Sequence, residues 1–299
     1  SPVKAYQALE KPGQKWHIHG YITVIGCYLL MMFYTTVSGW MLHYFYLTAT
    51  GKFTGLDADQ VGGVFNEMLS QPLVMAFWMI VVVAIGIFVC SRGLQNGLEK
   101  ITKVMMIALL AIMVVLAINS IMMDGAAEGL KFYLIPDFER MKELGIGYTI
   151  VTAMNQAFFT LSLGIGAMAI FGSYLDKSRS LTGESLSILL LDTCVALTAG
   201  LIVFPACFSF NVQPDAGPRL VFITLPNIFT QMPGGRVWGA LFFLFLFFAA
   251  LSTIVGVFEN IVSFGIDLFG FSRKKSVGIN IVLIIVLSIP CILGFNILS

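Results

Sequence analysis

The stretch Gln156-Ala-Phe-Phe-Thr160-Leu-Ser162-Leu-Gly164-Ile-Gly166 decides how the rest of the chain is interpreted, because it places polar residues and two glycines in the middle of an apolar run. We expect a helix to break there. A break leaves backbone carbonyls and amides unpaired, and a bilayer tolerates this only where those groups line a cavity or hold a ligand. The alternative is that Gly164 and Gly166 merely permit close helix packing.

The runs on either side of this stretch are typical of a membrane protein. Of 299 residues, 58% are hydrophobic and 11% are charged, whereas a soluble domain has about a quarter of its residues charged. Crossing the hydrocarbon layer takes about 20 helical residues. Runs of that length recur at 21–46, 72–90, 104–122, 148–174, 185–210, 238–268 and 277–297. We therefore predict an all-α integral membrane protein with about seven spans in a single domain, 1–299.

The basic residues predict how the chain is oriented, because Lys and Arg concentrate in short cytoplasmic loops. Of the 17, eleven fall on one side of the predicted spans: Lys4, Lys11, Lys15, Arg92, Lys100, Lys103, Lys177, Arg179, Arg273, Lys274 and Lys275. The other side has six: Lys52, Lys131, Arg140, Lys142, Arg219 and Arg236. We expect a multi-pass plasma-membrane protein, with the N-terminus of this chain cytoplasmic and its C-terminus external.

Two acidic residues, Asp192 and Glu259, fall deep within apolar runs, where an ionised group costs roughly 2.5–3.5 kcal/mol. Asp192 is either protonated, hydrogen-bonded by a neighbour such as Thr193, or paired with a bound cation, and we favour the cation. Glu259 is a proton carrier or an interhelical hydrogen-bonding residue, and the structural role is our default.

Other polar side chains allow two interpretations each. Ala249, Ser252 and Thr253 stand at i, i+3 and i+4, so that their oxygens converge on one helical face. That arrangement suits an alkali cation, yet Ser and Thr also hydrogen-bond to their own helix. Tyr34 needs a partner for its hydroxyl, which is either a nearby carbonyl or the carboxylate of a ligand.

Several classes of function are disfavoured. The net charge of +1 and the lack of a basic stretch interleaved with aromatics argue against a nucleic-acid partner. The five cysteines are scattered through apolar runs and are expected to be small core residues rather than a disulfide framework or a zinc site. We find no nucleophile–base motif and assign no catalytic residue, so we expect neither an enzyme nor an organic cofactor.

Four motifs occur in the order expected for one known family: Gly97-Leu-Glu-Lys100, the stretch 156–166, Phe222-Ile-Thr-Leu-Pro226 and Phe248-Ala-Ala-Leu-Ser-Thr253. Together they closely resemble the neurotransmitter:sodium symporter family, and especially its bacterial, leucine-transporter-like amino-acid members. The resemblance implies the inverted-repeat sodium symporter fold, in which the present spans match the third to ninth of twelve helices. By this match the chain lacks the family's first and last helices.

The resemblance also implies a substrate site. Tyr34 would hydrogen-bond the substrate carboxylate, Phe159, Thr160 and Ser162 would bound the substrate, and Gln156 and Phe159 would act as gate residues. Leu30, Ile165 and Val257 match positions that shape an apolar subsite, so a hydrophobic amino acid is the implied substrate.

Two sodium sites follow in the same way. Thr160 and Asp192 would belong to the first, and the Ala249 carbonyl with the Ser252 and Thr253 hydroxyls to the second. Asp192 departs from the asparagine usual in the family, and Ala196 stands where chloride-dependent members carry serine. The fixed carboxylate therefore implies that chloride is not required.

The resulting prediction is a sodium-coupled symporter that imports a small, hydrophobic amino acid by alternating access, with this chain supplying part of each site. A proton-coupled amino-acid carrier on the same fold is the first alternative, and a seven-helix receptor-like protein is the second. The amino acid itself, the sodium stoichiometry and the oligomeric state are left open by the sequence.

Overall fold

The computed structural model describes residues 1–91, 99–173, 175–176, 178–210, 212 and 217–297. Within them the chain is helical. The helices are α1 (Pro2–Leu9), α2 (His17–Thr50), α3 (Ala58–Ser70), α4 (Pro72–Ser91), α5 (Glu99–Ile121), α6 (Ala126–Leu134), α7 (Phe138–Leu144), α8 (Ile146–Thr160), α9 (Ala167–Ser173), α10 (Leu181–Ser209), the π-helical turn η2 (Leu220–Thr224), α11 (Leu225–Gln231), α12 (Gly235–Phe269) and α13 (Arg273–Leu293).

Six of these helices are long and apolar enough to cross a membrane: α2, α4, α5, α10, α12 and α13. They coincide with six of the seven predicted runs. The remaining run, 148–174, is divided into α8 and α9, each of which is too short to span by itself. The predicted break is therefore confirmed, and it explains the difference between seven runs and six spanning helices. The last residue of that run, Tyr174, lies outside the described residues.

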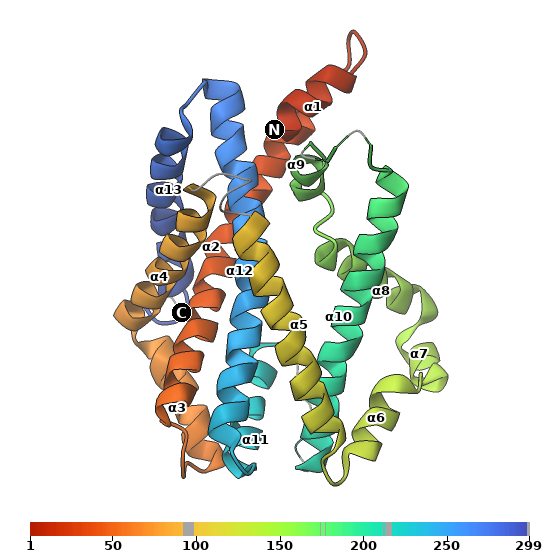
Figure 1. Cartoon of the computed structure of the whole chain (residues 1–299), viewed down its shortest axis with the longest axis vertical. Coiled ribbons are helices and arrows are strands. Elements are labelled where there is room, and N and C mark those ends of the chain that lie inside the picture. The colour runs from red at the N-terminus through yellow and green to blue at the C-terminus, as the bar shows by residue number, and fades with distance from the viewer. Residues whose placement is uncertain (92–98, 174, 177, 211, 213–216, 298–299) are drawn as a thin grey trace.

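The two ends of the bundle differ in character (Figure 1). At the upper end of Figure 1 lie the N-terminal ends of α2, α10 and α13, the last of which begins with Arg273, Lys274 and Lys275. At the lower end lie α3 and α11, with α6 close by. Basic connections thus gather at one end, as the charge pattern predicts. Arg92 and Lys177 lie outside the described residues.

The packed side of the molecule is built around α12, which contacts α2, α4, α5 and α13. Close approach is made possible by small residues: a Cβ on Gly39 of α2 would lie 2.8 Å from the backbone nitrogen of Met79 in α4. Large aromatic side chains fill the interior towards α3 and η2, where Tyr44 and Phe222 are fully buried and their ring centroids lie 5.0 Å apart. This side is a close-packed core.

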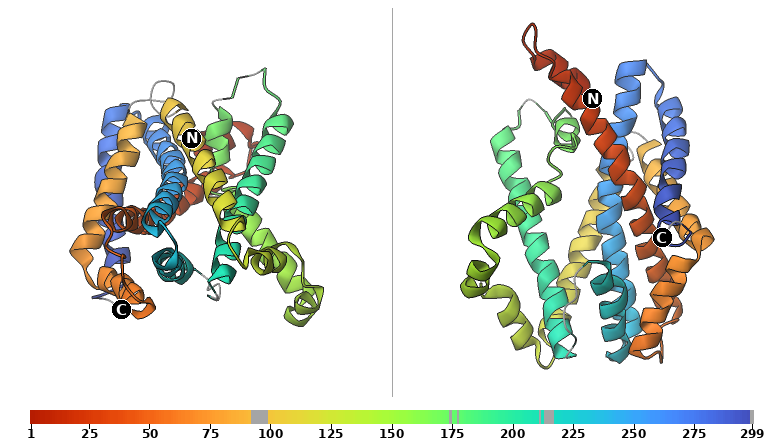
Figure 2. Two further views of the ribbon diagram at one scale, coloured as in Figure 1. Left: turned by 60° about the horizontal axis from the view of Figure 1, so that its bottom comes forward. Right: turned by 180° about the vertical axis from the view of Figure 1, so that it is seen from behind.

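The other side of the molecule is formed by α6, α7, α8 and α10, which lie together apart from α12 and α13 (Figures 1 and 2). Helix α8 has no buried residue, and large apolar side chains such as Tyr148, Ile150 and Phe159 are more than half exposed. Helix α10 is attached mainly through α5 and α6. The break between α8 and α9 stands where this exposed side meets the packed side.

Candidate functional site

The chain leaves the helical path directly after Thr160. Ser162 adopts a left-handed conformation with φ of 53°, and among the described residues it is the only non-glycine with positive φ. The amide of Leu163 donates to the carbonyl of Phe158 at 3.0 Å, a bond typical of a helix C-terminus closed by a left-handed residue. Gly164 and Gly166 follow with φ of 88° and 74°. We call residues 161–166 the break segment.

A cavity of about 270 Å³ lies against the break segment, close to the size of small-molecule sites. Its walls come from α2, α8, α12 and the break segment itself. The lining residues are Leu30, Tyr34, Gln156, Phe158, Phe159, Thr160, Ser162, Leu163, Ile165 and Thr253. Residues far apart in the sequence therefore meet at one hollow, and apolar side chains predominate with a few hydroxyl groups among them.

Most of the residues expected to contact a substrate line this cavity. Leu30, Tyr34, Phe159, Thr160, Ser162 and Ile165 do so, together with the expected gate residue Gln156. Val257 does not line it: this side chain is 2% exposed and packs within the apolar core on α12. Phe158 and Leu163 line the cavity and were not predicted, because helical periodicity cannot say which side chains beside a break turn inwards.

Asp192 on α10 lies beside the last residue of α8. The Thr160 hydroxyl donates to Asp192 Oδ1 at 2.9 Å. Thr193, suggested by the sequence as a neighbour able to hydrogen-bond Asp192, instead donates to the carbonyl of Leu189 in its own helix. The Thr160–Asp192 pair thus joins α8 to α10 and places two oxygen-bearing side chains together at the break, and hard cations prefer oxygen ligands.

The second group of oxygens lies on α12. Ser252 donates to the carbonyl of Ala249 at 2.8 Å, so this pair adopts the local hydrogen bond that the sequence left as an alternative. Thr253 instead lines the cavity, as Tyr34 does. Ser252 and Ala249 are partly exposed on the same helix.

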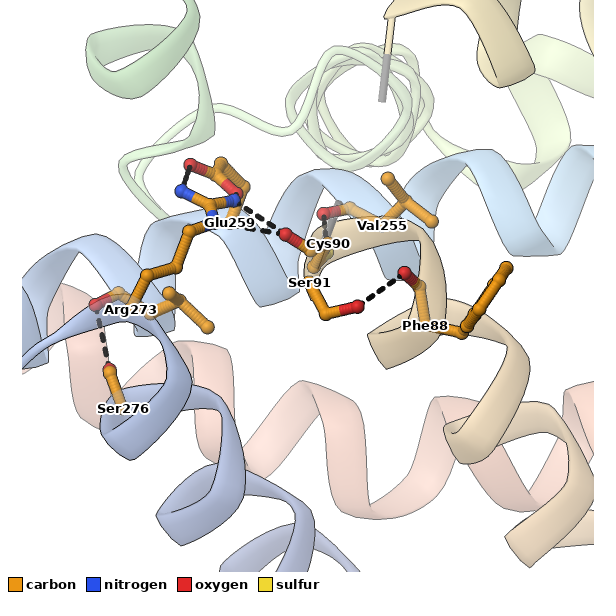
Figure 3. A network of polar contacts seen from close by, with 8 residues as sticks. Phe88, Cys90, Ser91, Val255, Glu259, Arg273 and Ser276 are labelled. Atoms are coloured by element: carbon orange, nitrogen blue, oxygen red, sulfur yellow. Dashed lines mark hydrogen bonds and ion pairs between the residues drawn. The ribbon is translucent and has the colours of Figure 1, made fainter. Parts of the chain in front are cut away.

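Glu259 forms an ion pair with Arg273 at the start of α13, and its side chain is fully buried. The same guanidinium donates to the carbonyl of Cys90 near the end of α4, with Nη2 at 2.8 Å and Nε at 3.0 Å (Figure 3). The Glu259–Arg273 pair therefore connects α12, α13 and α4, as the default structural role of Glu259 predicts. Arg273 is the first residue of α13 and precedes the apolar run predicted at 277–297, which is why the sequence did not indicate it as a partner.

Comparison with known proteins decides the family. Residues 64–297 match the family model described as the sodium:neurotransmitter symporter family. The chain belongs to this family. The motifs that indicated it are found on α8 and the break segment, on η2 with α11, and on α12. Of the motif Gly97–Lys100, the first two residues lie outside the described residues and the last two begin α5.

Relatives of this chain are transporters and not enzymes. The sodium-dependent transporter YhdH of Bacillus subtilis is 36% identical over 99% of this chain and 65% of its own length. A sodium-dependent transporter of Methanocaldococcus jannaschii is 31% identical over 94% of this chain and 60% of its own length. The chain thus spans less than two thirds of the length of these relatives.

A solved structure confirms the fold. The crystal structure of MhsT in complex with L-phenylalanine superposes with a TM-score of 0.88 and 36% identity, covering 99% of this chain and 66% of that one. The predicted all-α inverted-repeat symporter fold with one broken helix is therefore correct.

Proposed function

We propose that the complete protein containing this chain is a sodium-coupled symporter that imports a hydrophobic amino acid. The observation that carries this proposal is the cavity at the break segment, where Tyr34 and Thr253 supply hydroxyl groups while Leu30 and Ile165 supply aliphatic walls. An amino acid with an apolar side chain matches this lining, because the hydroxyl groups can bind its charged end and the aliphatic walls can contact its side chain. The relation to MhsT, whose structure holds L-phenylalanine, supports the same substrate class.

The role of sodium rests on Thr160 and Asp192. Thr160 both lines the cavity and donates to the Asp192 carboxylate, so a cation held by these oxygens would lie next to the substrate. Binding of the cation and of the amino acid would then favour each other. Thr253, with the Ala249 carbonyl and the Ser252 hydroxyl, would contribute to a second sodium site, and Val257 would support the apolar subsite from behind the cavity wall.

Alternating access supplies the transport step. Helix α8 contacts the packed side sparsely, and α10 is attached to it mainly through α5, which suits a fold in which one bundle rocks against another. Inward movement of each sodium ion releases about 2.3 kcal/mol per 100 mV of membrane potential. We place the N-terminus of this chain in the cytoplasm and its C-terminus outside, on the strength of the basic connections at one end.

Uptake by the full-length protein in proteoliposomes tests the proposal. We expect labelled leucine to accumulate under an inward sodium gradient and not when choline replaces sodium. Phenylalanine and tryptophan should compete, and glutamate should not. Uptake driven by a proton gradient without sodium would instead support the alternative carrier; the Glu259–Arg273 ion pair argues against Glu259 as its proton site.

Chloride dependence tests the assignment of Asp192. We expect uptake to persist when gluconate replaces chloride, because the carboxylate already supplies a fixed negative charge. The variant Asp192→Asn should acquire a chloride requirement. A requirement for chloride in the wild-type protein would contradict this part of the proposal.

A further inference from the structure

The carbonyls freed by the break are directed at the packed side of the molecule. The Thr23 hydroxyl of α2 donates to the carbonyl of Gly164 at 3.2 Å. The next carbonyl, that of Ile165, accepts from Cys27 Sγ at 3.1 Å and from Asn260 Nδ2 of α12 at 2.8 Å. These bonds join the break segment to the two helices that form the centre of the core.

Asn260 and Cys27 are both fully buried. A carbonyl oxygen has two lone pairs, and in Ile165 the two donors occupy both. The orientation of the Asn260 amide is fixed by chemistry, because a carbonyl can only accept a hydrogen bond and the opposite orientation would set two oxygens against each other. Asn260 Nδ2 also lies 3.2 Å from Cys27 Sγ, so the two donors form one cluster.

The residue held in this way is itself part of the cavity. Ile165 presents its side chain to the cavity while its carbonyl is bound on the core side. The following residue leaves no space for movement towards the core: a Cβ on Gly166 would lie 2.6 Å from Thr23 Cγ2 and 3.1 Å from Asn260 Nδ2. The position of the Ile165 wall is therefore set by contacts behind it.

We infer that Asn260 and Cys27 are positioning residues of the substrate site. They do not line the cavity, and they act by holding the Ile165 peptide so that its side chain stands at a fixed distance from Leu30 and Tyr34. Loss of either donor leaves a buried carbonyl lone pair unpaired, and the peptide can then turn or shift to recover a partner. The inference rests on the proposed function, because it concerns the affinity of the same site.

The chain contains a matched control for Asn260. Asn280 on α13 is also a buried asparagine; it accepts from the Tyr28 hydroxyl at 2.5 Å and donates to the carbonyl of Ser276 at 2.8 Å. It joins α13 to α2 without contacting the break segment in the described residues. Replacing Asn280 removes a buried amide of the same size while leaving the Ile165 carbonyl bound.

The experiment compares Asn260→Ala, Cys27→Ala, Cys27→Ser and Asn280→Ala in the full-length protein in detergent. Three quantities are measured: the thermal midpoint, the Kd of labelled L-phenylalanine at saturating sodium, and hydrogen–deuterium exchange of peptides covering residues 161–167 and α13. The serine variant retains a donor to the Ile165 carbonyl, and the alanine variant does not.

We expect Asn260→Ala to raise the Kd about tenfold, as the loss of a buried hydrogen bond suggests, and to speed exchange at 161–167. Cys27→Ala should act in the same direction, and Cys27→Ser should restore the affinity. Asn280→Ala should lower the thermal midpoint and speed exchange in α13 while leaving the Kd unchanged.

The inference is overturned if Asn260→Ala and Asn280→Ala change the Kd equally, or if Asn260→Ala lowers the midpoint without changing either the Kd or the exchange at 161–167. If the wild-type protein binds no hydrophobic amino acid in sodium, the proposed function fails instead, and the exchange experiment still reports whether Asn260 holds the break segment.

Discussion

Helices α12 and α10 are both long and apolar, yet they occupy opposite environments. In the most apolar 18 residues of α12, 61% are buried within the chain, against 6% in α10. The hydropathy of the two helices therefore predicts that both are shielded from water, but it does not predict which parts of the chain each helix contacts. The cavity lies between the two regions, with Leu30, Tyr34 and Thr253 from the packed side and the α8 residues from the exposed side. Residues of the close-packed side thus face residues of the exposed side across the cavity, which is the arrangement that the proposed alternating access would use.

The largest difference in stability between the packed and the exposed region is expected when one ion pair is broken in each region. Arg273→Met removes the guanidinium from the fully buried Glu259, and breaking a buried pair costs about 3–5 kcal/mol. Arg179→Met breaks the exposed pair with Glu184 at 3.3 Å, which is worth no more than about 1 kcal/mol. Thermal midpoints of the two variants in detergent provide the measurement. Equal losses would contradict the division into packed and exposed regions.

A smaller effect is expected from glycine substitutions along a single helix. Gly39→Ala places a methyl group 2.8 Å from the backbone of α4, and overpacking of this kind costs about 1–3 kcal/mol. Gly26→Ala, in the same helix, meets no atom within 4 Å and should be neutral or slightly stabilising. The amount of monodisperse protein on size-exclusion chromatography after heating should separate the two variants. If both variants lose the same amount of monodisperse protein, the close approach of α2 and α4 does not stabilise the packed side as claimed.

The smallest effect on stability is expected on α8. Phe159→Ala should change the free energy of unfolding by less than about 0.5 kcal/mol, because the side chain is 65% exposed. Its place in the cavity wall predicts a weaker Kd for L-phenylalanine, by about tenfold. Ile150→Ala on the same helix, equally exposed but outside the cavity, is the control. An unchanged Kd in Phe159→Ala would remove this residue from the site.

The sequence predicts the spans and the break well, because both depend on local composition. Runs of apolar residues predict the helices, and the glycines at 164 and 166 allow the positive φ within the break segment that follows α8. The cavity residues Tyr34, Phe159 and Ile165 came from a family resemblance, since polar residues in a span do not by themselves say what they contact.

Contacts between distant helices could not be predicted in this way. Glu259 has its partner 14 residues away at the start of α13, and Asn260, directly beside it, contacts the break segment 95 residues earlier. Both residues are polar and buried on α12, and only the packing of α12 against its neighbours gives them different roles. The sequence likewise predicts only that Cys27 is a small core residue, whereas the structure shows its hydrogen bond to the Ile165 carbonyl.

The central claim is that the break segment and Asp192 hold a sodium ion next to the substrate. A sodium titration of labelled L-phenylalanine binding to the full-length protein tests it most directly, comparing wild type with Thr160→Val and with the control Thr152→Val, whose hydroxyl donates only within α8. We predict that binding requires sodium and that Thr160→Val raises the sodium concentration for half-maximal binding about tenfold, while Thr152→Val leaves it unchanged. Binding without sodium in the wild type, or an identical titration in Thr160→Val, would contradict the claim.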